Sequence, residues 1–72
     1  MKFTFEYEFK KALDSFENKN YQLAKELINP ILKNQPKNHN ALHLMGLIMG
    51  SENFHSNALI YFNKALKIDP KN

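Results

Sequence analysis

Two histidines four residues apart, His39 and His43, have the spacing best suited to chemistry in this 72-residue chain. On a helix this spacing puts both imidazoles on one face, where they could bind a metal ion. No Cys, Asp or Glu stands at a supporting position on the same segment. We therefore interpret the pair as exposed histidines without a ligand role, and the sequence predicts no metal site and no cofactor.

Groups for acid–base or nucleophilic catalysis do not form a recognisable pattern. The chain has no Cys for thiol chemistry, and neither Ser51 nor Ser56 belongs to a nucleophile motif. Both glycines, Gly46 and Gly50, fall on one predicted helix, so there is no glycine-rich loop for a phosphate. We predict a protein that is not an enzyme and has no catalytic residues.

The charge distribution argues against a nucleic-acid ligand. The net charge is +3, but all ten basic residues are Lys and none is Arg, the side chain that best recognises bases and phosphates in a bidentate manner. No apolar run approaches the roughly 20 residues of a membrane span. Cys is absent and the first residues do not resemble a signal peptide. We expect a cytoplasmic protein that binds neither nucleic acid nor membrane.

Apolar residues follow a helical period along the whole chain, which predicts an all-α protein. We expect helices over about residues 4–17, 21–34, 40–52 and 56–68. Thr4 is the expected cap of the first helix. Pro30 lies within the second, where we expect a kink and not a break because Ile31 and Leu32 continue the apolar stripe.

The chain nearly repeats itself at an interval of 34 residues. The repeated pairs are Ala24 and Ala58, Leu32 and Leu66, Lys33 and Lys67, Pro36 and Pro70, Lys37 and Lys71, and Asn38 and Asn72. A fixed period of this length is typical of stacked helical hairpins, each too small to bury its apolar face alone. We therefore predict a single domain over residues 1–72, with one repeat at about 5–38 and a second at about 39–72.

These residues resemble the tetratricopeptide repeat (TPR), a 34-residue helix–turn–helix unit. The second repeat matches the family spacing at Leu42, Met45, Gly46, Met49, Ala58, Phe62, Ala65 and Pro70, and the first at Tyr21, Ala24, Ile28, Leu32 and Pro36. The resemblance implies two tandem hairpins stacked as a short right-handed α-solenoid. It also implies a groove, lined by the first helix of each repeat, that binds a peptide or a partner helix.

The position of the first helix within this pattern is open to two interpretations. Strict 34-residue alignment puts Glu8, Lys11 and Ser15 at interior positions, whereas a shift by one residue buries Phe9 and its apolar neighbours and shortens the following turn. We favour the shifted alignment. The resemblance then implies a small, mostly apolar groove for a protein or peptide partner, lined by Asn40, His43, Leu44, Leu47, Ser51, Lys10 and Asp14.

The last helix suggests an alternative function. A stack of repeats normally ends in a polar helix, but several residues of the last helix are large and apolar: Leu59, Tyr61, Phe62 and Leu66. We expect some of them to be exposed and to promote self-association into a homodimer or a higher oligomer. The alternative is therefore a structural, self-assembling repeat unit, or a fragment of a longer TPR array.

Overall fold

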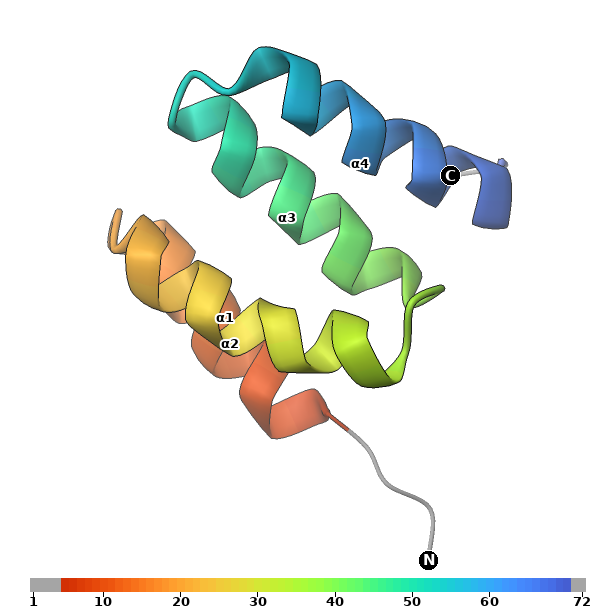
Figure 1. Cartoon of the computed structure of the whole chain (residues 1–72). Helices are drawn as coiled ribbons and strands as arrows, with labels where there is room; N and C mark the ends of the chain where they lie inside the picture. The colour runs from red at the N-terminus through yellow and green to blue at the C-terminus, as the bar shows by residue number, and fades with distance from the viewer. Residues whose placement is uncertain (1–4, 71–72) are drawn as a thin grey trace, which may run out of the picture.

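The computed structural model describes residues 5–70, and within them the chain is all-α (Figure 1). Its helices are α1 (Glu6–Glu17), α2 (Tyr21–Asn34), α3 (His39–Ser51) and α4 (His55–Ile68). The predicted fold class is confirmed: α1 pairs with α2 and α3 with α4 in two tandem hairpins that stack on each other. Thr4, the expected cap of the first helix, lies outside the described residues.

Asparagine side chains cap the starts of α2 and α3. The Asn20 side-chain oxygen accepts a hydrogen bond from the Leu23 N–H at 3.3 Å, and that of Asn38 accepts one from the Ala41 N–H at 3.0 Å. Each bond satisfies one of the backbone donors that a helix leaves free at its first turn. The starts of α2 and α3 therefore follow directly from the sequence.

Helix α2 continues through Pro30, as predicted. Proline cannot donate to the carbonyl four residues earlier, but Pro30 is exposed, and Ile28 and Ile31 on either side of it are fully buried. Because both isoleucines pack into the core on the same face, the burial of their side chains holds the helix together across the missing bond.

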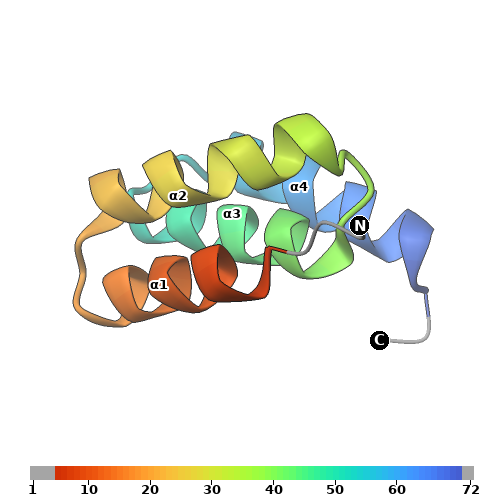
Figure 2. The same cartoon turned by 90° about the horizontal axis from the view of Figure 1, so that it is seen from below.

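The core lies between the two hairpins. Helix α3 packs against α1 and α2 (Figure 2) as well as against its partner α4. Helix α4 contacts no helix other than α3 among the described residues (Figure 1). The main cluster of buried side chains comes from α1, α2 and α3 and consists of Ala12, Ala24, Ile28, Ile31, Ala41, Leu44, Met45 and Ile48. Half of this cluster therefore comes from α3, which joins the two hairpins.

The backbone shows the same 34-residue repeat as the sequence. Both hairpin turns have the same length, and each contains one residue in the left-handed region, Lys19 (φ 63°) or Asn53 (φ 69°). The following residue, Asn20 or Phe54, donates its N–H at 2.8 Å to the carbonyl five residues earlier in both turns. The turn after the first helix is not shortened, so the shifted alignment that we favoured is wrong.

Ser15 and Lys11 show how the strict alignment avoids burying charge. Ser15 is buried, and its hydroxyl donates to the Lys11 carbonyl oxygen at 2.9 Å. Lys11 itself is exposed, with its ammonium 5.4 Å from the centre of the Tyr7 ring. A position that α3 buries against a preceding hairpin is simply open to solvent on α1, because no hairpin precedes it in the described chain. Four apolar side chains, from the residue before α1 and from α1 itself, still pack against the core: Phe5, Phe9, Leu13 and Phe16.

Candidate protein-interaction site

Helix α3 exposes only one narrow stripe to solvent. Four of the predicted groove residues form it: Asn40, His43, Leu47 and Ser51. Leu44 is not available to a partner, because its side chain is 2 % exposed and belongs to the buried cluster between the hairpins. The groove prediction is wrong at this residue, since the face of α3 that carries Leu44 packs on the first hairpin.

Lys10 and Asp14 do not join this stripe. Both are exposed, but by the 34-residue repeat they correspond to Leu44 and Ile48, which face the first hairpin and not the groove. Lys10 and Asp14 therefore lie on the outer face of α1. Their assignment to the groove depended on the shifted alignment. Because that alignment is wrong, the assignment is wrong as well. The α1 positions that correspond to the exposed stripe are Glu6, Phe9, Leu13 and Glu17.

The predicted self-association residues differ in exposure. Leu59 is 60 % exposed and Leu66 is 50 % exposed. Tyr61 and Phe62 are half-buried, and Phe62 packs so closely on α3 that a Cβ atom on Gly46 would lie 2.5 Å from its ring. The sequence reasoning missed Ile60, which is 51 % exposed. Its position is charged in the first repeat, where Glu26 stands, and that substitution is the signal that could have identified it.

The structure brings the two predicted sets together at one pocket. A cavity of about 500 Å³ lies between the start of α3 and the end of α4 and is lined by His39, Asn40, His43, Phe62, Ala65 and Leu66. Its aromatic wall is continuous: the His39 and His43 rings are stacked with centroids 6.3 Å apart, and the Phe62 ring lies 5.5 Å from that of His43. We call this the α3–α4 pocket.

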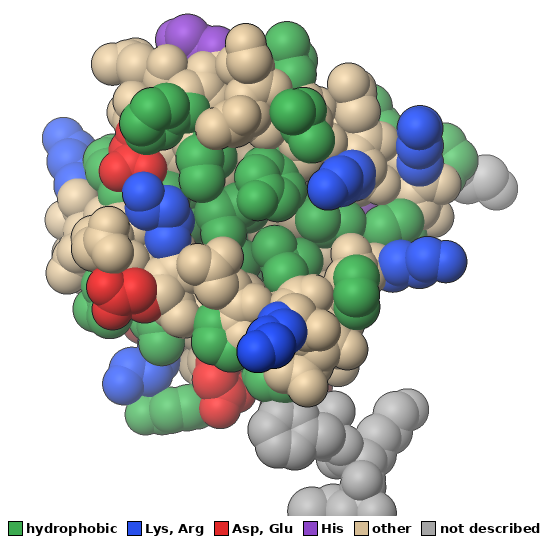
Figure 3. All heavy atoms as spheres, viewed as in Figure 1, with side chains coloured by type: hydrophobic (Ala, Val, Ile, Leu, Met, Phe, Trp, Pro, Cys, Tyr) green, Lys and Arg blue, Asp and Glu red, His purple; other side chains and the backbone are tan. Residues whose placement is uncertain are grey.

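The side chains around the α3–α4 pocket are suited to binding and not to metal coordination. Among residues 5–70 no three His, Cys, Asp or Glu side chains converge where a metal ion could sit. Helix α4 carries two lysines, Lys64 and Lys67, and no acidic residue. Figure 3 shows hydrophobic side chains gathered at the centre of the face on which α2 lies in front, with both lysines and acidic side chains around them. The pocket is lined by apolar side chains and a few polar ones, which favours an apolar ligand with hydrogen-bonding groups at its edge.

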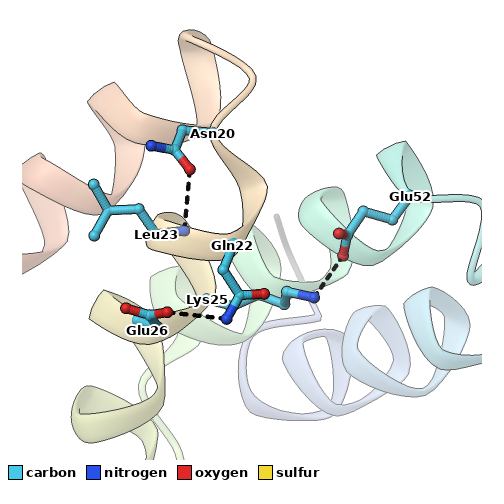
Figure 4. A network of polar contacts seen from close by, with 6 residues as sticks. All are labelled: Asn20, Gln22, Leu23, Lys25, Glu26 and Glu52. Atoms are coloured by element: carbon cyan, nitrogen blue, oxygen red, sulfur yellow. Dashed lines mark hydrogen bonds and ion pairs between the residues drawn. The ribbon is translucent and has the colours of Figure 1, made fainter.

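An ion pair joins the two hairpins on the other side of α3. The Lys25 ammonium on α2 lies 2.9 Å from Glu52 Oε1, just after the end of α3 (Figure 4). That oxygen is buried and has no other hydrogen-bond partner in the described part of the chain. The corresponding position on α4 is Leu59, which is exposed. The two second helices of the hairpins therefore present different groups at the same place.

Comparison with protein-family models, with curated proteins and with solved structures finds no match to this chain. None of the helices in the described region is long and apolar enough to cross a membrane.

Proposed function

We propose that this chain is a TPR-like protein–protein interaction module that binds a helix or a peptide at the α3–α4 pocket and the exposed stripe of α3. Support for the TPR relationship comes from the 34-residue period in both the sequence and the turn geometry. The module acts by binding alone in this proposal, without a catalytic residue, a metal or a cofactor, and it works in the cytoplasm.

The observation that carries the proposal is the chemistry of the α3–α4 pocket. Phe62 and Leu66 offer apolar surface, and Asn40 and His43 offer hydrogen-bonding groups at its edge. Binding sites in proteins are mostly concave and apolar with a few polar groups that orient the ligand. Amphipathic helices and peptides are the ligands that such shallow apolar surfaces commonly accept.

Self-association through α4 is the second candidate function. The observation in its favour is that α4 contacts only α3, so that Leu59 and Leu66 remain exposed together with the neighbouring Ile60. Monomeric proteins seldom leave a contiguous apolar patch of more than a few hundred Å² uncovered. Two copies that pair their α4 helices would cover this surface.

Selection from a phage-displayed library of random peptides tests the proposal. We expect the full chain to enrich peptides that bind the wild type and lose binding to Leu66→Glu, because this substitution puts a charge inside the α3–α4 pocket. Lys10→Glu is the control, since Lys10 is also exposed but lies on the outer face of α1. A library that yields no peptide, or peptides that bind Leu66→Glu as well as the wild type, would contradict the proposed function. Circular dichroism confirms that each variant is folded.

A further inference from the structure

A second, smaller cavity lies next to the α3–α4 pocket. It has a volume of about 230 Å³ and is lined by Phe5, Glu6, Phe9, Gln35, Asn38 and Asn40. We call it the α1–α3 recess. Asn40 lines the α3–α4 pocket as well, so the two cavities adjoin at this residue. A ligand that fills the α3–α4 pocket can therefore continue across Asn40 into the recess.

The walls of the α1–α3 recess suit a cationic side chain. Phe5 and Phe9 supply half-buried aromatic rings, and the faces of such rings attract cations. Glu6 adds a carboxylate, and no other Asp, Glu, Lys or Arg is among the residues that line either cavity. Glu6 is exposed and has no ion-pair partner in the described part of the chain. A neutral ligand placed over it would remove water from the carboxylate and give it no partner, whereas an ammonium or guanidinium group would pair with it.

The amide side chains of the recess have separate roles. The Asn38 amide nitrogen donates to Gln35 Oε1 at 2.8 Å, and the Asn38 oxygen accepts from the Ala41 N–H. These two amides are therefore engaged within the chain. Asn40 is exposed, and its side chain has no hydrogen-bond partner among residues 5–70. An amide side chain can donate and accept at once, so Asn40 can bond the backbone of a peptide that crosses from one cavity to the other.

The distance between the two cavities favours an extended peptide. Helices α1 and α3 lie side by side and contact each other (Figure 2), and packed helices are about 8–10 Å apart. Phe9 of the recess and His43 of the pocket stand at equivalent positions of the 34-residue repeat. In an extended chain, alternate side chains point to the same side and lie about 6.6–6.8 Å apart. The length of a lysine or arginine side chain covers the remaining distance.

We propose that the α1–α3 recess binds a lysine or arginine side chain of an extended peptide whose large apolar side chain, two residues away, occupies the α3–α4 pocket. Asn40 holds the peptide backbone between the two cavities. This inference rests on the proposed function and defines the peptide.

The test compares two nine-residue peptides with blocked ends. One has the sequence Gly-Ser-Lys-Ser-Phe-Ser-Lys-Ser-Gly, and the other has glutamate in place of both lysines. Because a lysine stands on each side of the phenylalanine, the peptide offers the required spacing in either chain direction. Each peptide is titrated into the full ¹⁵N-labelled chain at low ionic strength, where exposed charges are least screened. Its affinity is measured from amide chemical shifts.

We expect the lysine peptide to bind the wild type at least about threefold more tightly than the glutamate peptide. Glu6→Lys should reverse this preference, because it puts an ammonium group in the recess in place of the carboxylate. Asp14→Lys is the matched control, since it changes the net charge by the same amount on the outer face of α1 and should leave the preference unchanged. Asn40→Ala should weaken both peptides to the same extent, because Asn40 bonds the backbone and not the charged side chain.

Four results would overturn the inference. Equal binding of the two peptides, or a preference that Glu6→Lys does not change, shows that the cationic side chain is not in the recess. A preference lost equally in Asp14→Lys shows an effect of net charge alone. These outcomes leave the proposed function standing.

The other two results concern the occupant itself. If neither peptide shifts any amide at millimolar concentration, this ligand is refuted, while the library selection judges the proposed function independently. A dimer of the chain alone in sedimentation equilibrium at tens of micromolar, lost in Asn40→Arg, shows that a second copy occupies the two cavities.

Discussion

Two glycines on α3 provide a matched test of how closely α3 and α4 pack. A Cβ atom added to Gly46 would lie 2.5 Å and 2.7 Å from two ring atoms of Phe62, closer than real Cβ contacts allow. A Cβ atom added to Gly50 would meet only the Ala58 Cβ, at an ordinary 3.8 Å. The added methyl group of the Gly→Ala change therefore overlaps a neighbouring side chain at Gly46 and fits without overlap at Gly50.

The magnitudes follow from two opposing effects. Replacing glycine by alanine inside a helix stabilises it by about 0.5–1 kcal/mol, and this gain applies to both positions. Overpacking costs about 1–3 kcal/mol, and it applies at Gly46 alone. We expect Gly50→Ala to raise the free energy of unfolding and Gly46→Ala to lower it or leave it unchanged. The difference between the two variants should be about 1–3 kcal/mol, because the helix-propensity gain largely cancels.

Urea denaturation followed by circular dichroism measures this difference. In a chain of this size each kcal/mol corresponds to a shift of about 4–8 °C in the melting temperature, so thermal melting gives a second reading. Adding Phe62→Leu to Gly46→Ala should restore part of the lost stability, because the two residues are in contact and their effects are coupled. Equal stability of Gly46→Ala and Gly50→Ala would refute the close approach of α3 and α4 at Gly46.

Further predictions follow from the contacts between the hairpins and from the two ends of the stack. A fragment of residues 39–72 should be largely unfolded in circular dichroism, because α3 buries its main stripe on the first hairpin; a sharp melting transition of this fragment as a monomer would contradict this. Lys25→Met should lower the free energy of unfolding in urea by about 1–3 kcal/mol, because it leaves the buried Glu52 oxygen without a partner. Lys33→Met, at an exposed lysine of the same helix, is the control, and equal effects of the two would disprove the contribution of the ion pair. The triple change Lys10→Leu, Lys11→Met and Asp14→Ile gives α1 the residues that α3 has at the corresponding buried positions. It should make the outer face of α1 apolar and produce head-to-tail oligomers in sedimentation velocity. An unchanged sedimentation coefficient at tens of micromolar would show that charge at these positions does not close the α1 end.

The helices were predictable because their signals are local. Apolar residues at helical spacing defined all four elements, and observed bounds differ from predicted ones by at most two residues. The passage of α2 through Pro30 could also be foreseen, since Ile31 continues the buried stripe beyond it. These features depend on residues within one or two turns of each other.

The alignment of the first helix with the repeat could not be predicted from such local signals. We assumed that positions interior in the second repeat must be interior in the first, and so rejected Lys11 and Ser15 there. Burial depends on what packs outside a helix, and α1 has no hairpin on its outer face in the described chain. Lys10 and Asp14 were assigned to the groove for this reason, although their charges indicate an outer surface.

The candidate site was predicted in parts but not as a whole. The sequence identified Asn40 and His43 as groove residues and Phe62 and Leu66 as self-association residues. It did not show that these four residues line one pocket, because α3 and α4 meet there through their packing angle and not through sequence spacing. Leu44 was assigned to the groove because a helix that is apolar almost all round does not reveal which side faces the neighbouring hairpin.

The most direct test of the central claim is a chemical-shift map of the full ¹⁵N-labelled chain with a peptide enriched in the library selection. We predict that the largest amide shifts belong to residues of α3 and α4 around the α3–α4 pocket, with little change along the outer face of α1. Shifts concentrated around Lys10 and Asp14, or a spectrum that the peptide leaves unchanged, would contradict the proposal that this chain binds a peptide or a helix at the α3–α4 pocket.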